Sequence, residues 1–318
     1  MGQHSLANLY SVIHHLGVPL KYVCVTSEHK ARLIEQKFAG IKATTSLDEV
    51  LNDASVSGIF VSASPTAHFS IASRVLKCGK SLFIEKPPCQ SLDELHRLIY
   101  LQRQYCSPVA MVGLQRRYAP AVQVLKQRLG KQRPVNYDLH YLTGAYPEGD
   151  ALIDLFIHPL DLACCLFGKP EIIACRQVGA ASYLLMLQHP QAVGTLELST
   201  AHSWATAAQT LKVCTTRAVY RLSPSEELTC EPIPMHICGV PIDKIRSRNS
   251  MLVHLCKPNP FLSVLTNNPI YRQGYFGEIN TFLNAVEGCN KHTPTDFEAI
   301  TDTYQLIEEL RNLHAHIT

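Results

Sequence analysis

The chain of 318 residues lacks several features that would assign it to a class at once. No stretch approaches the roughly 18 uninterrupted apolar residues of a membrane span, so we expect no transmembrane helix. The start, Met1 to Ser5, is not a basic segment that leads into an apolar one, so we expect no signal peptide. The formal net charge of only +3 gives no reason to expect a nucleic-acid or membrane partner.

The spacing of the cysteines also shows no pattern that is typical of disulfides or of a zinc site. The chain has 12 cysteines, but they are scattered and form no C-x-x-C pair. This argues against a disulfide framework and a zinc site, so we expect no bound metal and reduced thiols of a cytoplasmic protein. What the sequence does have is 46% hydrophobic and only 17% charged residues, enough for one large or two ordinary folded domains.

The first third of the chain alternates short apolar runs with amphipathic segments of roughly ten residues. This alternation is typical of parallel βαβ units. We therefore expect residues 1–118 to form an α/β, Rossmann-like, dinucleotide-binding domain with a doubly wound parallel sheet. The expected strands are 22–25, 58–62, 81–85 and 109–113. The expected helices are 3–16, 28–38, 67–78 and 91–105, with a short one after Ser46.

The pattern changes near residue 134, and residues 119–318 are expected to form an α+β substrate-binding domain with a large, mostly antiparallel sheet. Its expected strands are 135–142, 172–178, 183–188, 193–199, 210–215 and 218–222. One helix is expected over 151–167, and two closing helices over 275–287 and 296–313. Residues 223–270, rich in Pro, Asn and Cys, have too weak a periodicity to assign.

The stretch from Ser81 to Pro88 is the most informative in the chain. Its apolar run ends abruptly at Glu85-Lys86-Pro87, as a buried parallel strand would. Ligands of open α/β sheets lie beyond the carboxyl ends of the strands, so Glu85 and Lys86 are expected to project into a ligand crevice. The alternative is an ordinary surface ion pair at a strand end.

The usual first strand of such a domain, and the glycine-rich turn after it, have no residues to occupy here. Gly2 could be the last glycine of a G-x-G-x-x-G turn. We favour the interpretation that the sequence begins about ten residues late. The alternative is a true loss of the strand, which would weaken pyrophosphate binding.

Five short motifs in this order resemble the Gfo/Idh/MocA family of NAD(P)-dependent sugar and cyclitol oxidoreductases. They cover nearly the whole chain and lie at 62–68 (S-A-S-P-T-A-H), 85–87 (E-K-P), 113–118 (G-L-Q-R-R-Y), 154–161 (D-L-F-I-H-P-L-D) and 274–278 (G-Y-F-G-E). The resemblance is specific for the family but says little about the substrate. It implies hydride transfer between a nicotinamide cofactor and a secondary alcohol of a sugar, nucleotide sugar or cyclitol.

The resemblance implies that Lys86, Asp154 and His158 are the catalytic residues. Asp154 and His158 are four residues apart, so one helical face would hold both, with Asp161 on the same stripe. The alternative is a core histidine paired with a carboxylate. We hypothesise that His158 is the general acid/base, because imidazole titrates near neutral pH. Asp154 would orient it or bind a substrate hydroxyl, and Lys86 would hydrogen-bond the reacting oxygen.

The cofactor is expected to be NADP or NAD. Ser27, with basic neighbours, could take a 2′-phosphate, whereas Glu28 could serve a ribose 2′-OH. The remaining expected cofactor-binding residues lie near strand ends and include Gly2, Ser62, Ser64, Pro65, His68, Glu85, Lys86 and Arg116. Arg116 or Arg117 could reach phosphate or substrate, and at least one of them is expected to be a solvated surface charge.

Two other functions remain open at this point. One is a catalytically inactive sensor or scaffold, which the short front would favour. The other is an NAD-dependent glycosidase. We also expect a dimer or tetramer formed through the open face of the large sheet, and a pocket lined in part by Tyr141 to Tyr146.

Overall fold

The computed structural model describes residues 5–179, 182–224, 226–234, 236–245, 252–259, 261–288 and 292–315. The chain forms two compact units. Unit 1 comprises Met1–Gln115 and Gly274–Thr301, and unit 2 comprises Arg116–Gln273 and Asp302–Thr318. The sequence predicted that the chain passes once from the first domain to the second, at residue 118. In the structure it passes to unit 2 after Gln115 and returns to unit 1 for the segment Gly274–Thr301.

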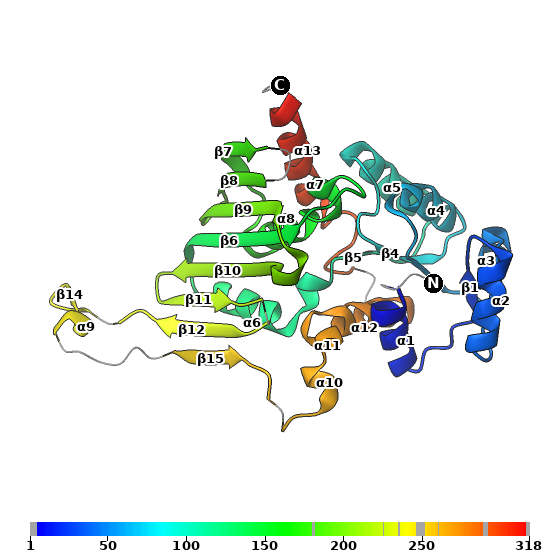
Figure 1. Ribbon diagram of the computed structural model, residues 1–318, viewed down its shortest axis with the longest axis horizontal. Coiled ribbons are helices and arrows are strands. Elements are labelled where there is room, and N and C mark those ends of the chain that lie inside the picture. The colour runs from blue at the N-terminus through cyan, green and yellow to red at the C-terminus, as the bar shows by residue number, and fades with distance from the viewer. Residues whose placement is uncertain are drawn as a thin grey trace. The chain divides into compact units, whose positions relative to one another are not determined.

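The parallel strands of unit 1 match the α/β expectation. β3 (Gly58–Val61), β4 (Ser81–Glu85) and β5 (Ala110–Gly113) pair in that order, and every pair is parallel (Figure 1). Every residue of β4 is buried, as its continuous apolar run predicts. β1 (Tyr22–Cys24) pairs in parallel with β2 (Lys42–Thr44), a strand that the sequence did not indicate.

The helices of unit 1 begin where polar capping residues predict. Ser46 accepts a hydrogen bond from the Glu49 N–H, and Ser91 accepts one from the Glu94 N–H. The expected helix over 3–16 is described from Ser5 onward and divides into two types, because its first turns are π-helical. The helices are η1 (Ser5–Tyr10), α1 (Ser11–His15), α2 (Glu28–Lys37), α3 (Leu47–Asn52), α4 (Pro65–Lys77) and α5 (Leu92–Gln104).

The late segment returns to unit 1 because α12 (Tyr275–Val286) presents an aromatic face to the parallel sheet. The Phe282 ring lies 5.0 Å from the ring of Phe60 and 5.7 Å from that of Phe83, centroid to centroid. The Val112 N–H donates to the Thr295 carbonyl at 2.9 Å, which ties the segment after α12 to β5. These partners lie far apart in sequence, so no local pattern announced this return.

Unit 2 contains an eight-stranded sheet in the described residues, with the order β15-β12-β11-β10-β6-β9-β8-β7 (Figure 1). Only β6 and β9 pair in parallel, so the mostly antiparallel sheet is confirmed. The strands expected from alternation are β6 (Pro134–Gly144), β7 (Glu171–Val178), β8 (Ser182–Gln188), β9 (Val193–His202), β10 (Ala208–Thr215) and β11 (Ala218–Leu222).

The segment that the sequence left unassigned supplies two further strands of this sheet, β12 (Leu228–Pro232) and β15 (Val253–Cys256). The other short elements between and after them are β13 (His236–Ile237), β14 (Val240–Pro241), α9 (Ile242–Ile245), α10 (Val264–Asn267) and α11 (Pro269–Arg272), and η3 (Trp204–Thr206) lies between β9 and β10. The closing helix α13 (Thr301–Ala315) begins five residues later than expected.

One expected helix is two helices in the structure. The segment 151–167 divides into α7 (Ala151–Asp154) and α8 (Ile157–Phe167). Pro159 has no N–H to donate to Leu155, and the His158 N–H takes that carbonyl instead at 3.3 Å. Proline is well suited to the first turn of a helix, so α8 starts afresh around it. α8 then packs on the sheet, where Phe167 stacks on Tyr137 with 4.1 Å between ring centroids.

Among the described residues, no helix is both long and apolar enough to cross a membrane. The same part of the chain contains no group of three or more His, Cys, Asp or Glu side chains that could hold a metal ion.

Candidate active site

The carboxyl ends of β3, β4 and β5 meet at one edge of the parallel sheet, which we call the carboxyl edge. Val61 pairs with Ile84, and Glu85 pairs with Gly113, so the loops that follow the three strands begin at the same edge. This edge carries Ser62, Ser64, Pro65 and Lys86. Parallel α/β sheets bind their ligands at this edge, which makes it the candidate cofactor site.

His68 joins two of these loops. The Ala63 N–H donates to His68 Nε2 at 3.3 Å, so Nδ1 carries the ring proton and donates to the Pro87 carbonyl at 2.7 Å. The side chain is only 1% exposed, and this burial lowers the pKa of His68 below its ordinary value. His68 is therefore held as a neutral side chain between the loops after β3 and β4.

Glu85 and Lys86 have different surroundings, although both were expected to project into a crevice. Glu85 is only 8% exposed and lies against Gly113, where an added Cβ would be 3.1 Å from Glu85 Oε2. The Glu85 side chain is therefore buried against the neighbouring strand at the carboxyl edge, and its role towards a ligand stays a prediction. Lys86, one residue later, is half-buried.

Each of the serines expected to bind the cofactor has a hydrogen-bond partner within unit 1. Ser27 caps α2 by accepting from the Lys30 N–H at 3.4 Å, and Ser62 Oγ lies 2.7 Å from Ser5 Oγ. Ser64 Oγ accepts from the Thr66 hydroxyl at 3.4 Å. Gly2 lies outside the described residues. Ser62 and Ser64 thus share the carboxyl edge with Lys86, whereas Ser27 lies at the amino end of α2.

In unit 2, Asp154 and His158 lie on either side of the break between α7 and α8. Asp154 is 7% exposed and accepts a hydrogen bond from the Tyr146 hydroxyl at 3.4 Å. Burial, the charge of Asp154 and this hydrogen bond raise the pKa of Tyr146, which keeps the phenol protonated as a donor. A Cβ on Gly149 would lie 2.3 Å from Asp154 Oδ2, so the carboxylate fits only beside glycine. His158 is half-buried at the second residue of α8.

Asp161 does not share this environment, although the sequence placed it on the same stripe. It forms a two-pronged ion pair with Arg117, with Nε–Oδ2 and Nη2–Oδ1 distances of 2.8 and 2.5 Å. Thr303 donates to Asp161 Oδ1 at 3.1 Å. Both charged side chains are buried. Burial alone would lower the pKa of Arg117, but the Asp161 carboxylate outweighs it and raises that pKa.

Neither arginine of the 113–118 motif is the solvated surface charge that we expected. Arg117 is buried in its ion pair, and the partly buried Arg116 donates to the Glu226 carboxylate. Glu226 is only 7% exposed. Arg116 therefore binds a carboxylate of its own chain, within unit 2.

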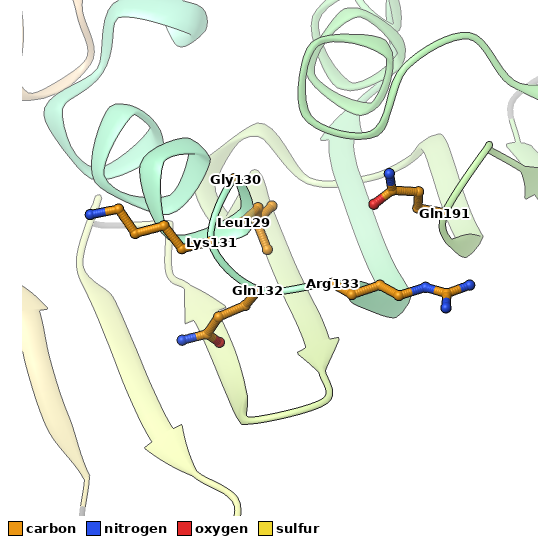
Figure 2. Close-up of a pocket in the computed structure, with 6 residues that line it drawn as sticks. All are labelled: Leu129, Gly130, Lys131, Gln132, Arg133 and Gln191. Atoms are coloured by element: carbon orange, nitrogen blue, oxygen red, sulfur yellow. The ribbon is translucent and has the colours of Figure 1, made fainter.

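A hollow of about 510 Å³ at the connection between α6 (Pro120–Leu129) and β6 contains none of the expected site residues. Its lining residues are Leu129, Gly130, Lys131, Gln132, Arg133 and Gln191 (Figure 2). Lys131 and Arg133 extend in opposite directions from the connecting segment, so their charges do not converge (Figure 2).

Residues 1–114 match the profile of a family described as "Oxidoreductase family, NAD-binding Rossmann fold". Over these residues the chain is similar to the Gfo/Idh/MocA family. The "Putative oxidoreductase YceM" of Salmonella typhimurium is 32% identical over 131 residues, which cover 40% of this chain and 42% of that protein. The "Inositol 2-dehydrogenase/D-chiro-inositol 3-dehydrogenase" of Lactiplantibacillus plantarum is 27% identical over 156 residues, 46% and 44% of the two chains. The matched region thus spans less than half of each relative.

Solved structures resemble the fold of this chain over nearly its whole length. A dehydrogenase from Chromobacterium violaceum aligns with a TM-score of 0.82 at 20% identity, covering 100% of this chain and 97% of that one. The UDP-N-acetylglucosamine 3-dehydrogenase GnnA from Acidithiobacillus ferrooxidans aligns with a TM-score of 0.74 at 20% identity, covering 95% and 92%. At this identity the likeness concerns the fold, a parallel-sheet domain with a large, mostly antiparallel sheet.

Several residues of the candidate site were not predicted from the sequence. Tyr146 was expected only as one of several pocket-lining residues, and Gly149 was not expected at all. The acid that directly follows Gly149 is Asp150, whereas the carboxylate that Gly149 approaches is that of Asp154, so the local sequence did not indicate this contact. Glu226 has no local signal, because its arginine partner lies 110 residues away in sequence.

Proposed function

We propose that this protein is an NAD(P)-dependent oxidoreductase that transfers a hydride between a nicotinamide cofactor and a secondary alcohol. We propose a sugar, nucleotide sugar or cyclitol as the substrate. The observation that carries the proposal is the match of residues 1–114 to an NAD-binding Rossmann family. A buried acid, Asp154, and a half-buried histidine four residues later, His158, support it, because alcohol oxidation needs a group that takes the hydroxyl proton.

The residues of the carboxyl edge fit a dinucleotide. α4 begins there at Pro65, and no side chain caps its first N–H groups, which suits an anionic or hydroxyl group. The hydroxyls of Ser62 and Ser64 and the ammonium of Lys86 add donors at the same edge. The bound cofactor would supply the hydride acceptor or donor. Ser27 would favour a 2′-phosphate and Glu28 a 2′-OH, so either NADP or NAD remains compatible with this loop.

The proposed roles follow from these environments. His158 would take the proton of the substrate hydroxyl on oxidation and return it on reduction. Asp154, held by Tyr146, would orient the imidazole or bind a neighbouring hydroxyl. Lys86 would donate a hydrogen bond to the reacting oxygen, where its positive charge favours a developing alkoxide.

A direct test begins with cofactor binding by the wild-type chain. We expect NAD(H) or NADP(H) to raise the free energy of unfolding through linkage, by about 2.7 kcal/mol at 100-fold excess over Kd. The melting temperature should rise accordingly. Turnover is then measured on a panel of sugars and cyclitols, with Lys86→Ala and His158→Ala as variants. Near-wild-type turnover by both variants on an identified substrate would contradict the proposed roles. If millimolar cofactor has no effect on stability, the oxidoreductase proposal fails and the sensor becomes the better hypothesis.

We also propose that the protein is a dimer or tetramer in the cytoplasm. The outer strands β7 and β8 expose apolar side chains to solvent, including Val178 at 56% and Leu184 at 48%. Pairing of such surfaces would remove them from water. Leu184→Arg should then lower the molar mass measured by light scattering. A wild-type chain that is monomeric at micromolar concentration would refute this proposal.

A further inference from the structure

A second polar cluster lies in unit 2, at the end of the sheet where β11 finishes and β10 begins. Leu222, the last residue of β11, pairs with Leu211 of β10. The turn after β11 therefore lies beside the start of β10 and carries Glu226, while the start of β10 carries Gln209. Neither residue belongs to a family motif described above.

Glu226 combines an unusual backbone conformation with an ion pair of its side chain. Its backbone φ is 59°, in the left-handed region that side chains rarely adopt. One carboxylate oxygen, Oε1, accepts from Arg116, whereas the other, Oε2, is buried and has no hydrogen-bond partner among the described residues. Backbone outliers of this kind concentrate at ligand sites. A buried carboxylate oxygen without a donor is costly, so a ligand group that donates a hydrogen bond to it would be stabilised there.

Gln209 repeats this pattern on the adjoining strand. It is 9% exposed, and its Oε1 is buried without a partner in the described part of the chain. Gln209 pairs directly with Tyr141 of β6, so the two side chains share one face of the sheet. Arg116 acts electrostatically on Tyr141 and lowers its pKa, although burial raises that pKa overall. Gln209 thus neighbours Tyr141 in the sheet, and Arg116 links Tyr141 electrostatically to Glu226.

This cluster connects to the proposed catalytic residues through aromatic packing. The Tyr141 ring meets the Phe156 ring edge-on, with 6.1 Å between centroids. Phe156 lies in the break between α7 and α8, between Asp154 and His158.

We propose that Glu226 and Gln209 form a subsite that accepts hydrogen bonds from substrate hydroxyl groups and rejects a carboxylate or phosphate at that position. Hydroxyl groups supply the donors that the two buried oxygens lack. An anionic group would face the carboxylate of Glu226 and find Arg116 already neutralised. This inference rests on the proposed function, because it defines which polyols the oxidoreductase would accept.

The test compares D-glucose with D-glucuronate, which replaces a neutral hydroxymethyl group with a carboxylate, and adds myo-inositol as a second neutral polyol. Wild-type chain with its preferred cofactor should favour the neutral compounds. Glu226→Gln should lower kcat/KM for the neutral compounds by about 10–100-fold and narrow the preference over D-glucuronate, because Arg116 is no longer neutralised. Glu227→Gln, the same charge change at the adjacent position, should leave the preference unchanged.

Gln209→Met separates the two acceptors. It should lower kcat/KM for the neutral polyols by about tenfold but keep the discrimination against D-glucuronate, because the Arg116–Glu226 pair remains. The subsite is refuted if Glu226→Gln leaves the neutral-to-anionic ratio unchanged, or if the wild type prefers D-glucuronate.

Calorimetric binding of the same three compounds, in the presence of cofactor, distinguishes this proposal from the proposed function. Neutral polyols that bind and are weakened by Glu226→Gln support the subsite even if no hydride is transferred. If none of them binds to the wild type, the subsite is wrong, whatever the cofactor does. Cofactor binding itself, followed by fluorescence, reports only on the proposed function.

Discussion

His68 and His158 both belong to family motifs, yet the structure gives them opposite surroundings. His68 is almost fully buried in unit 1, and both ring nitrogens bond to backbone groups. His158 is half-buried at the start of α8 in unit 2, and Asp154, four residues before it, ends α7. Both ring nitrogens of His68 bond to the backbone, so this side chain holds loops in place. His158 is partly exposed, so it can exchange protons with a ligand.

The two acids that flank His158 teach the same lesson. Asp154 lies near the break between α7 and α8 with a tyrosine donor, whereas Asp161 is enclosed with Arg117 and Thr303. Sequence spacing places all three side chains on one stripe, but burial and partners divide them into a chemical group and a structural one.

The largest effect should come from His158→Ala. We expect kcat/KM on an identified substrate to fall by about 10²–10⁴-fold, because a general acid/base contributes that much to proton transfer. Stability should change little, since the side chain is only half-buried. Steady-state kinetics and thermal melting of the same preparation check both statements. A variant that loses stability but keeps turnover would make His158 the structural histidine and overturn the comparison.

Asp161→Ala should act on stability more than on chemistry. Removal of one partner leaves the buried Arg117 charge without its carboxylate, which costs about 3–5 kcal/mol. Urea denaturation followed by circular dichroism measures this loss. The matched control is Asp93→Ala, which breaks the exposed Asp93–Arg97 pair and should cost at most about 1 kcal/mol. Equal losses in the two variants would contradict a structural role for Asp161.

His68→Phe should have an intermediate effect on stability. The change keeps a flat ring but leaves the Ala63 N–H and the Pro87 carbonyl without their partner, at a cost of about 1–3 kcal/mol. His96→Phe, an exposed position on α5, serves as control. If the two variants have the same melting temperature, His68 does not hold the loops after β3 and β4 as described.

The same variant should also change the response to acid. Burial lowers the pKa of His68 below its ordinary value of 6.5, so the unfolded chain binds a proton at a higher pH than the folded chain. Stability is therefore fully present above that value and is lost as the pH falls through the folded pKa. The free energy of unfolding, measured between about pH 7.5 and pH 5, should fall less steeply in His68→Phe. Burial also lowers the pKa of His189, which leaves part of the slope in the variant. Parallel curves would exclude this origin.

Tyr146→Phe should give the smallest effect. It removes the hydroxyl that donates to Asp154, a bond worth about 0.5–1.5 kcal/mol, so kcat/KM should fall by roughly two- to tenfold. Tyr100→Phe, at a side chain that is 63% exposed, is the control. A larger loss than that of His158→Ala would mean that Tyr146, rather than His158, contacts the reacting group.

The elements that follow from local pattern were predictable. Strand-like runs at regular spacing predicted β6 to β11, and a continuous apolar run predicted β4 as a buried parallel strand. Ser46 and Ser91 marked helix starts that the structure confirms. These signals are readable because side chains repeat every two residues in a strand and every 3.6 in a helix, and because a cap bonds only a few residues ahead.

Tertiary structure alone decided the rest. It brought α12 back to the parallel sheet through Phe282, buried Glu85 against Gly113, and joined Arg116 to Glu226. It also separated Asp154 from Asp161 by giving them different partners. In each case the deciding contact joins residues that are remote in sequence, or depends on the space left beside a glycine, so no periodicity within the chain encodes it.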